Sequence, residues 1–220
     1  MGKLNSIVRQ IIVECAHIYQ RTFVDYDYLV CSSAFVKNPY YIIDAHEDNY
    51  EHLTGVTSKC SPQEFFDKCM NNTLLETDFE FIKKNQAEGM VRNFVKLKTA
   101  VLPKLDTIFN SDTFVEESFI KGRVVCSFAT ATDDFTLGFS IGKTAKPKSL
   151  LKGNFIQNRD NHLDLVIRRP HGQQLFSDVI VGNKAMLEKH LRDIKPLLSD
   201  FLIAQTCIYR RIRLSRSRGC

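Results

Sequence analysis

The stretch RVVCSFATATDDFTLGFSI, residues 123–141, decides the fold class. Two runs that are rich in β-branched and aromatic residues, 123–128 and 135–141, flank the polar segment Thr132-Asp133-Asp134. Such residues favour strands, and a short polar segment between two such runs is typical of an antiparallel hairpin. Apolar and polar residues alternate at 163–167, which predicts a further strand.

The regions around this hairpin contain a loop pattern and helix patterns. Residues 143–161 are rich in Lys, Pro, Gly and Asn, so we expect a connecting loop there. Residues 4–22 have apolar side chains at intervals of three and four, which predicts an amphipathic helix. Two short strands, 26–35 and 40–43, are expected to follow as a second hairpin.

Two more helices are expected before the central hairpin. Ser61-Pro62-Gln63-Glu64 has the residues of a helix start, namely a capping Ser, a Pro at the first helical position and a Glu that closes a capping box. A second helix is predicted over 90–109, with Phe94 and Leu97 on its inward stripe and a kink at Pro103.

The chain is therefore expected to be an α+β protein with N-terminal helices packed on an antiparallel, roughly four-stranded sheet. A C-terminal helix is predicted over 183–205, with a kink at Pro196. Because this helix follows the last predicted strand, we expect a main domain at 1–170 and a helical appendage at 171–220.

Composition places the chain among ordinary folded proteins. Its 220 residues are 44% hydrophobic and 25% charged, which gives no indication of disorder. Seven cysteines in a chain of this size are typical of free thiols in a reducing cytosol. The cysteines and histidines lack metal-ligand spacing, and no run of about 18 apolar residues occurs. We expect a cytoplasmic protein with no metal, no cofactor and no membrane span.

The positive charge is concentrated near the C-terminus. The net charge is +5, and the last eleven residues include five arginines and no carboxylate. Guanidinium groups bind phosphate oxygens bidentately, so such a tail suits a polyanion. A solvated, frayed terminus is the alternative interpretation. The arginines expected to contact phosphate are Arg210, Arg211 and Arg213.

The segment YEHLTGV, residues 50–56, is the best candidate for chemistry. If it is an extended turn after the second strand, His52 and Thr54 face the same side, and Gly55 permits a close approach. An imidazole can exchange a proton near neutral pH, and a hydroxyl can position a phosphate oxygen. The pair therefore suits acid–base work at a phosphodiester. A structural role is the alternative.

Four segments in order carry a resemblance to a known family. The HLTG motif at 52–55 is followed by SPQEFFDKC at 61–69, LKTAVLPKL at 97–105 and TLGF at 136–139. This order resembles the fourth phage-associated branch of the barnase/EndoU/colicin/RelE-like nucleases, over residues 15–170. The resemblance implies a small ribonuclease fold with an open sheet face for RNA. It also implies metal-independent cleavage, in which the 2′-hydroxyl attacks the adjacent phosphorus.

The resemblance also suggests residue roles. His52 is expected to be the general acid or base, with Thr54 as a phosphate ligand. The polar pair Lys148 and Ser149 stands where the family's loop carries a polar pair after a proline, and we expect it to contribute to the catalytic site. Further candidates for binding RNA phosphates, each with an alternative as a solvated loop residue, are Thr130, Arg123 and Lys143.

A second titrating group is harder to choose. His46 and His162 are candidates, although His46 follows Asp44 and could cap a strand end. A chain without such a group would be a nucleic-acid-binding or regulatory module, in which tyrosines of the first hairpin stack bases. A third hypothesis is a toxin that an inhibitory or immunity protein silences by docking on the C-terminal helix. The substrate is expected to be RNA, with tRNA as one candidate.

Overall fold

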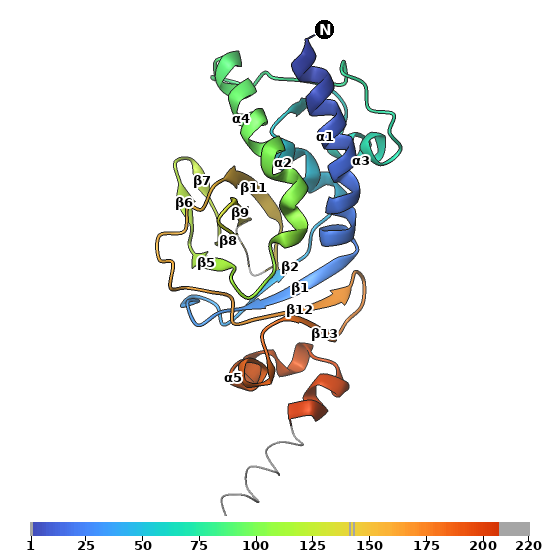
Figure 1. The fold of residues 1–220 in the computed structure, drawn as a ribbon. Coiled ribbons are helices and arrows are strands. Elements are labelled where there is room, and N and C mark those ends of the chain that lie inside the picture. Colours follow the sequence, from blue (N-terminus) through green and yellow to red (C-terminus); the bar gives the residue numbers. More distant parts are fainter. Residues whose placement is uncertain (1, 141, 143, 207–220) are drawn as a thin grey trace, which may run out of the picture.

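The structure, a computed structural model, describes residues 2–140, 142 and 144–206, and it confirms an α+β protein. Helices α1 to α4 gather above two sheets, and α5 lies at the opposite end (Figure 1). The helices are α1 (Lys3–Tyr19), α2 (Tyr50–Thr54), α3 (Pro62–Met70), α4 (Glu88–Val101) and α5 (Lys184–Ile194). Shorter helical turns are η1 (Gln20–Val24), η2 (Glu47–Asn49), η3 (Leu102–Thr107) and η4 (Lys195–Leu197).

One sheet has four antiparallel strands in the order β11-β9-β8-β5, as expected for the main sheet. Its strands are β5 (Phe114–Glu117), β8 (Phe128–Ala131), β9 (Phe135–Phe139) and β11 (Pro147–Lys152). Strands β8 and β9 form the predicted hairpin, in which Ala131 pairs with Thr136. The turn at 132–134 and the second strand lie where the pattern placed them, whereas the first strand is Phe128–Ala131 and not 123–128.

Strand β11 corrects the loop that was expected over 143–161. It pairs with β9 along its whole length, and Leu150, opposite Leu137, is fully buried. The lysines, the proline and the glycine of this segment obscured the strand signal of Leu150 and Leu151. A second correction concerns Val124 and Val125, which leave the central hairpin and form β7 (Val124–Val125) of a separate ribbon with β6 (Ile120–Lys121).

A second sheet has five strands in the order β10-β2-β1-β12-β13. Its strands are β1 (Tyr26–Cys31), β2 (Tyr41–Ile43), β10 (Thr144–Ala145), β12 (Leu165–Pro170) and β13 (Asp178–Val181). Strands β1 and β2 form the expected hairpin, and β12 is the strand predicted near 163–167. Strands β3 (Thr57–Ser58) and β4 (Phe79–Glu80) form a small separate pair.

The helix starts and breaks that depend on a few neighbouring residues are confirmed. The Ser61 side chain accepts a hydrogen bond from the Glu64 backbone N–H and so caps α3, as expected. Helix α4 changes to the 3₁₀ turn η3 just before Pro103, because proline cannot donate the helical hydrogen bond. Pro196 likewise lies in the 3₁₀ turn η4 that follows α5.

The inward stripe of α4 was wrong in two places. Val91, Val95 and Thr99 are buried, whereas Phe94 and Leu97 are 46% and 37% exposed. Exposed apolar side chains often mark a binding site, and Phe94 and Leu97 both line a pocket.

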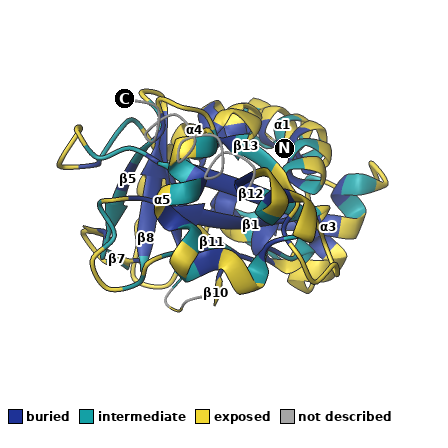
Figure 2. Ribbon diagram, turned by 90° about the horizontal axis from the view of Figure 1, so that it is seen from below, coloured by how far each residue is buried: buried dark blue, intermediate teal, exposed yellow. Residues whose placement is uncertain are grey.

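The C-terminal part packs against the second sheet. Strand β13 pairs with β12, and a separate buried cluster joins Leu29 and Leu165 of the sheet to Leu187 of α5. Figure 2 shows strands such as β1 and β12 largely buried, while the outer faces of the helices are exposed. The boundary expected at residue 170 thus falls between two paired strands, and the independence of 171–220 stays a prediction.

No helix among the described residues is long and apolar enough to cross a membrane.

Replacement of Leu187 by Ala tests how α5 is coupled to the sheet. Leu187 is 3% exposed, so its truncation should lower the free energy of unfolding by about 2–5 kcal/mol. We expect a single urea transition that shifts as a whole. The control is Leu175→Ala at a position that is 42% exposed, which should change little. A separate early transition in Leu187→Ala would show an independent appendage.

Candidate active site

The segment at residues 50–56 is helical, not extended, and this changes the roles of its side chains. Helix α2 spans Tyr50–Thr54, so His52 and Thr54 do not face the same side as an extended chain would require. Thr54 is fully buried, and its hydroxyl donates to the Glu51 carbonyl at 2.7 Å. Thr54 therefore stabilises the end of the helix, whereas the His52 side chain is exposed.

Gly55 ends α2 and makes room for a lysine. Its φ of +84° lies in the left-handed region, where glycine is favoured. A Cβ at this position would lie 2.8 Å from Cδ of Lys98, so the lysine stem passes directly against the glycine. The HLTG motif thus combines a helix end with a close approach that only glycine permits.

Lys98 extends from α4 to the end of α2. Its Nζ donates a hydrogen bond to the His52 carbonyl oxygen at 2.7 Å. Among the residues that the structure describes, no carboxylate forms an ion pair with it. Burial, together with the positive charge of Lys83, lowers the pKa of Lys98 to about 7. This lysine can therefore exchange a proton near neutral pH.

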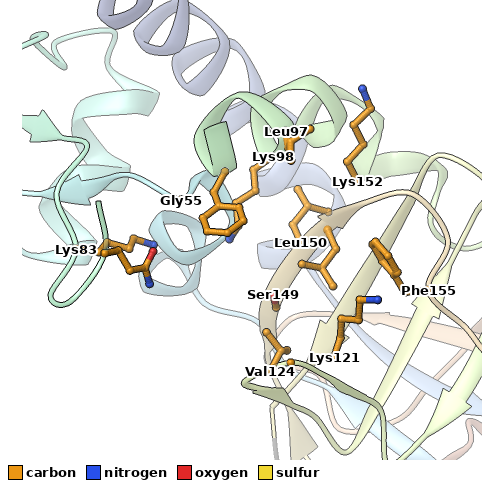
Figure 3. Close-up of a pocket in the computed structure, with 14 residues that line it drawn as sticks. Gly55, Lys83, Leu97, Lys98, Lys121, Val124, Ser149, Leu150, Lys152 and Phe155 are labelled. Carbon is orange, nitrogen blue, oxygen red and sulfur yellow. The ribbon is translucent and has the colours of Figure 1, made fainter. Parts of the chain in front are cut away.

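Lys98 lies in a pocket of about 540 Å³. The wall consists of the end of α2, the segment before α4, α4 itself, the turn between β6 and β7, and β11 with the loop after it. Figure 3 shows Gly55 and Lys98 on one side, and Lys121 and Phe155 on the other. The lining residues are Gly55, Lys83, Gln86, Phe94, Leu97, Lys98, Lys121, Gly122, Val124, Ser149, Leu150, Leu151, Lys152 and Phe155.

Three more lysines give the pocket a positive charge. Lys83, Lys121 and Lys152 line it together with Lys98, and Lys121 Nζ lies 4.3 Å from the centre of the Phe155 ring. Burial lowers the pKa of Lys83 as well, although Glu51 opposes this effect. Cations above an apolar floor with aromatic rings suit a ligand that carries both phosphate and a base.

A β-bulge separates the predicted pair Lys148 and Ser149. The register of β11 shifts between Pro147 and Ser149, and a bulge redirects the side chains on either side of it. Ser149 lines the pocket. Lys148 is outside the lining, and its Nζ donates to the Val125 carbonyl.

Thr136 of the TLGF segment holds the far wall of the pocket. Its hydroxyl donates to the Gly153 carbonyl at 2.8 Å and accepts from the Phe155 N–H at 2.9 Å. The loop after β11 is thereby fixed with Phe155 at the pocket. Three of the four segments that carry the family resemblance therefore meet here: Gly55 and Lys98 line the pocket, and Thr136 supports it.

The remaining candidates lie elsewhere. Thr130 is fully buried on β8, which removes its hydroxyl from contact with RNA phosphates in this conformation. Arg123 is exposed in the turn beside the pocket residue Gly122. His162 stacks on Phe114 and is not among the pocket residues. Outside the described residues are Lys143, Arg210, Arg211 and Arg213.

Sequence reasoning missed Lys98, Lys83 and Lys121 as site residues. A lysine on an amphipathic helix has the same pattern whether it faces solvent or a pocket. The one available signal was Gly55, because a glycine after a helix end can mark a place where another chain segment approaches closely.

The fold and the lysine pocket are those of a protein that can hold a phosphodiester. A family model described as phage-Barnase-EndoU-ColicinE5/D-RelE like nuclease4 matches residues 11–189, which include all the pocket residues, and the chain belongs to this nuclease family. The resemblance seen in the four sequence segments is thereby confirmed. No curated protein and no solved structure matched the chain significantly.

Replacement of Gly55 by Ala tests the close approach of Lys98. A side chain at this positive φ costs about 1–2 kcal/mol, and the new Cβ must also displace the lysine stem. We expect a lower free energy of unfolding by at least that amount, measured in urea. Gly89→Ala is the control, since a Cβ at Gly89 meets nothing within 4 Å. Equal stability of both variants would contradict the contact.

Replacement of Lys98 by Met tests the lowered pKa through stability. The unfolded chain keeps a pKa near the usual 10.5, so between about pH 7 and 10.5 the folded state binds fewer protons. The wild-type stability contributed by this residue therefore rises with pH across that window. Lys98→Met should be most stabilised relative to wild type below pH 7, and the difference should shrink toward pH 10.5.

Lys96→Met, at an exposed position on the same helix, is the matched control for urea unfolding across this pH range. A stability difference between Lys98→Met and wild type that stays constant with pH would show that Lys98 keeps its proton as an ordinary lysine does.

Proposed function

We propose that this nuclease is a metal-independent endoribonuclease that uses the lysine pocket. The observation that carries the proposal is Lys98, whose pKa is lowered to about 7 inside a pocket with three other lysines. A group with this pKa removes a proton at neutral pH far more readily than an ordinary lysine. RNA supplies such a proton at the 2′-hydroxyl next to each phosphate.

The proposed cleavage is an internal transesterification. Neutral Lys98 takes the proton of the 2′-hydroxyl, the 2′-oxygen bonds to phosphorus, and the bond from phosphorus to the 5′-oxygen breaks. We propose His52 as the acid that gives the leaving 5′-oxygen its proton; its exposed side chain is outside the pocket lining, and its backbone carbonyl accepts from Lys98 at the pocket edge. The products are a 2′,3′-cyclic phosphate and a 5′-hydroxyl.

The other pocket residues suit binding and charge stabilisation. Lys83 and Lys121 neutralise charge that develops on the phosphorane oxygens, and the Ser149 hydroxyl donates a hydrogen bond to one of these oxygens. Phe94 and Phe155 offer ring faces on which a base can stack. Lys148, Arg123 and the arginines of the C-terminal tail are proposed to contact the RNA backbone outside the pocket.

Two observations favour cleavage over binding alone. Tyr28 and Tyr41 of β1 and β2 are buried in the core, so they are not a platform for stacked bases. The lowered pKa of Lys98 also does not help a simple phosphate contact, because a charged lysine binds phosphate better than one that is partly neutral. We further propose a phage or prophage origin and a toxin-like role in the cytoplasm, with an inhibitory partner protein.

Cleavage of total RNA in EDTA tests the proposal. The wild type should cut RNA and leave DNA or 2′-O-methyl RNA of the same sequence intact. Loss of the base should lower the rate by about 100-fold or more in Lys98→Met, and His52→Ala should fall by a similar factor. Products are assigned by their cyclic phosphate ends.

Lys96→Met should cut at the wild-type rate. A wild-type protein that shifts RNA on a gel without cutting it would establish the binding module instead. Cleavage that survives in Lys98→Met would remove Lys98 from the reaction, and cleavage that needs added Mg²⁺ would contradict the metal-independent mechanism.

A further inference from the structure

A second cluster of titratable side chains lies where two strands of the five-stranded sheet end. Asp44 follows β2, His46 caps η2 two residues later, and His171 follows β12. One nitrogen of each imidazole and one oxygen of Asp44 all lie within 4.8 Å of one another. None of these residues lines the lysine pocket, so the cluster calls for a separate explanation.

Buried groups fix the ring of His171. Its Nδ1 lies 2.9 Å from Oδ1 of Asp27, which is only 2% exposed. The other oxygen of Asp27 accepts a hydrogen bond from Arg169 at 2.9 Å, and the Arg169 guanidinium lies over the Phe176 ring. The backbone N–H of His171 also donates to the Asp25 carbonyl. The contact with Asp27 uses the same Nδ1 that faces Asp44, and it fixes the orientation of the His171 ring.

The backbone of His46 is held from the other side. Its backbone carbonyl accepts a hydrogen bond from the Tyr19 hydroxyl at 2.9 Å, and its N–H donates to the Asn49 side chain. The two imidazoles meet edge to face, with ring centres 5.7 Å apart. The His171 ring and the backbone of His46 are therefore placed by contacts that do not depend on any ligand between them.

Asp44 completes the group. Its Oδ1 is buried and has no hydrogen-bond partner among the residues that the structure describes. This oxygen lies 3.5 Å from Nε2 of His46 and 3.8 Å from Nδ1 of His171. Tetrahedral ligands at about 2.1 Å from a zinc ion are about 3.4 Å apart, close to these separations. A buried carboxylate oxygen without a hydrogen-bond donor suits a metal ligand.

The local charge also favours a cation. The carboxylates of Asp27 and Asp44 lie 2.9 Å and 3.8 Å from His171 Nδ1. A negative potential that attracts a proton attracts a divalent ion as well, and the set of two imidazoles and one carboxylate suits a transition metal rather than Mg²⁺ or Ca²⁺.

We propose that Asp44, His46 and His171 bind one divalent transition-metal ion of the Zn²⁺ type. As the ion takes the Nδ1 lone pair of His171, the proton shared with Asp27 leaves to solvent, and water fills the remaining coordination. The ion links the end of β2 to the end of β12 and stabilises this edge of the sheet. It takes no part in the chemistry of the lysine pocket.

Titration of the EDTA-treated, dialysed full chain with Co²⁺ tests this site through the visible spectrum of the metal. We expect one equivalent to bind with a spectrum of nitrogen and oxygen ligands, and Zn²⁺ to displace it. Zn²⁺ should also raise the midpoint temperature of unfolding. His46→Ala and His171→Ala should lose the equivalent, whereas His17→Ala, an exposed histidine on α1, should keep it.

Asp44→Asn keeps the shape of the side chain and should weaken binding at least tenfold, so the test stands even if a histidine variant fails to fold. No binding by the wild type would show that the cluster holds only a proton and would overturn the proposal. Binding that survives in Asp44→Asn and both histidine variants, or a thiolate charge-transfer band, would assign the metal to the cysteines and would overturn it equally.

Discussion

The hydrogen bond from Lys98 to the His52 carbonyl is the interaction on which the proposed site depends. It requires a helix that ends at residue 54, a left-handed glycine beside the lysine stem, and a second helix that carries Lys98 across the gap. The rings of Tyr50, Phe66 and Tyr19 hold α2 in the core, so the carbonyl is a fixed acceptor. Burial removes water from the charged form of Lys98, and this lowers its pKa.

Much of the fold could be predicted from local patterns. The cap at Ser61, the break at Pro103 and the central hairpin each follow from chemistry within a few residues. Strand β11 could not be predicted in this way, because its apolar residues are few and its pairing with β9 is made across the sheet. The exchange of Val124 and Val125 into a separate ribbon is likewise a tertiary choice between two possible partners.

The site was predictable only in outline. The HLTG segment and Ser149 both belong to the pocket region, but the motif supplies a backbone carbonyl and a glycine, and Thr54 supplies a helix end. The pKa of Lys98 is lowered by burial and by the charge of Lys83. Lys83 precedes α4 in the sequence and lines the same pocket only in the folded chain. The cluster of Asp44, His46 and His171 arises in the same way, because β2 and β12 bring together residues that are far apart in sequence.

The titration of the Lys98 side chain by NMR tests the central claim most directly. With isotope-labelled lysine and Lys98→Met for assignment, the account predicts a midpoint near pH 7. It also predicts that Lys83→Met moves this midpoint upward, because a positive neighbour is removed. A midpoint at the ordinary lysine value of about 10.4 would contradict the account, since Lys98 would then be a charged phosphate contact and not a base.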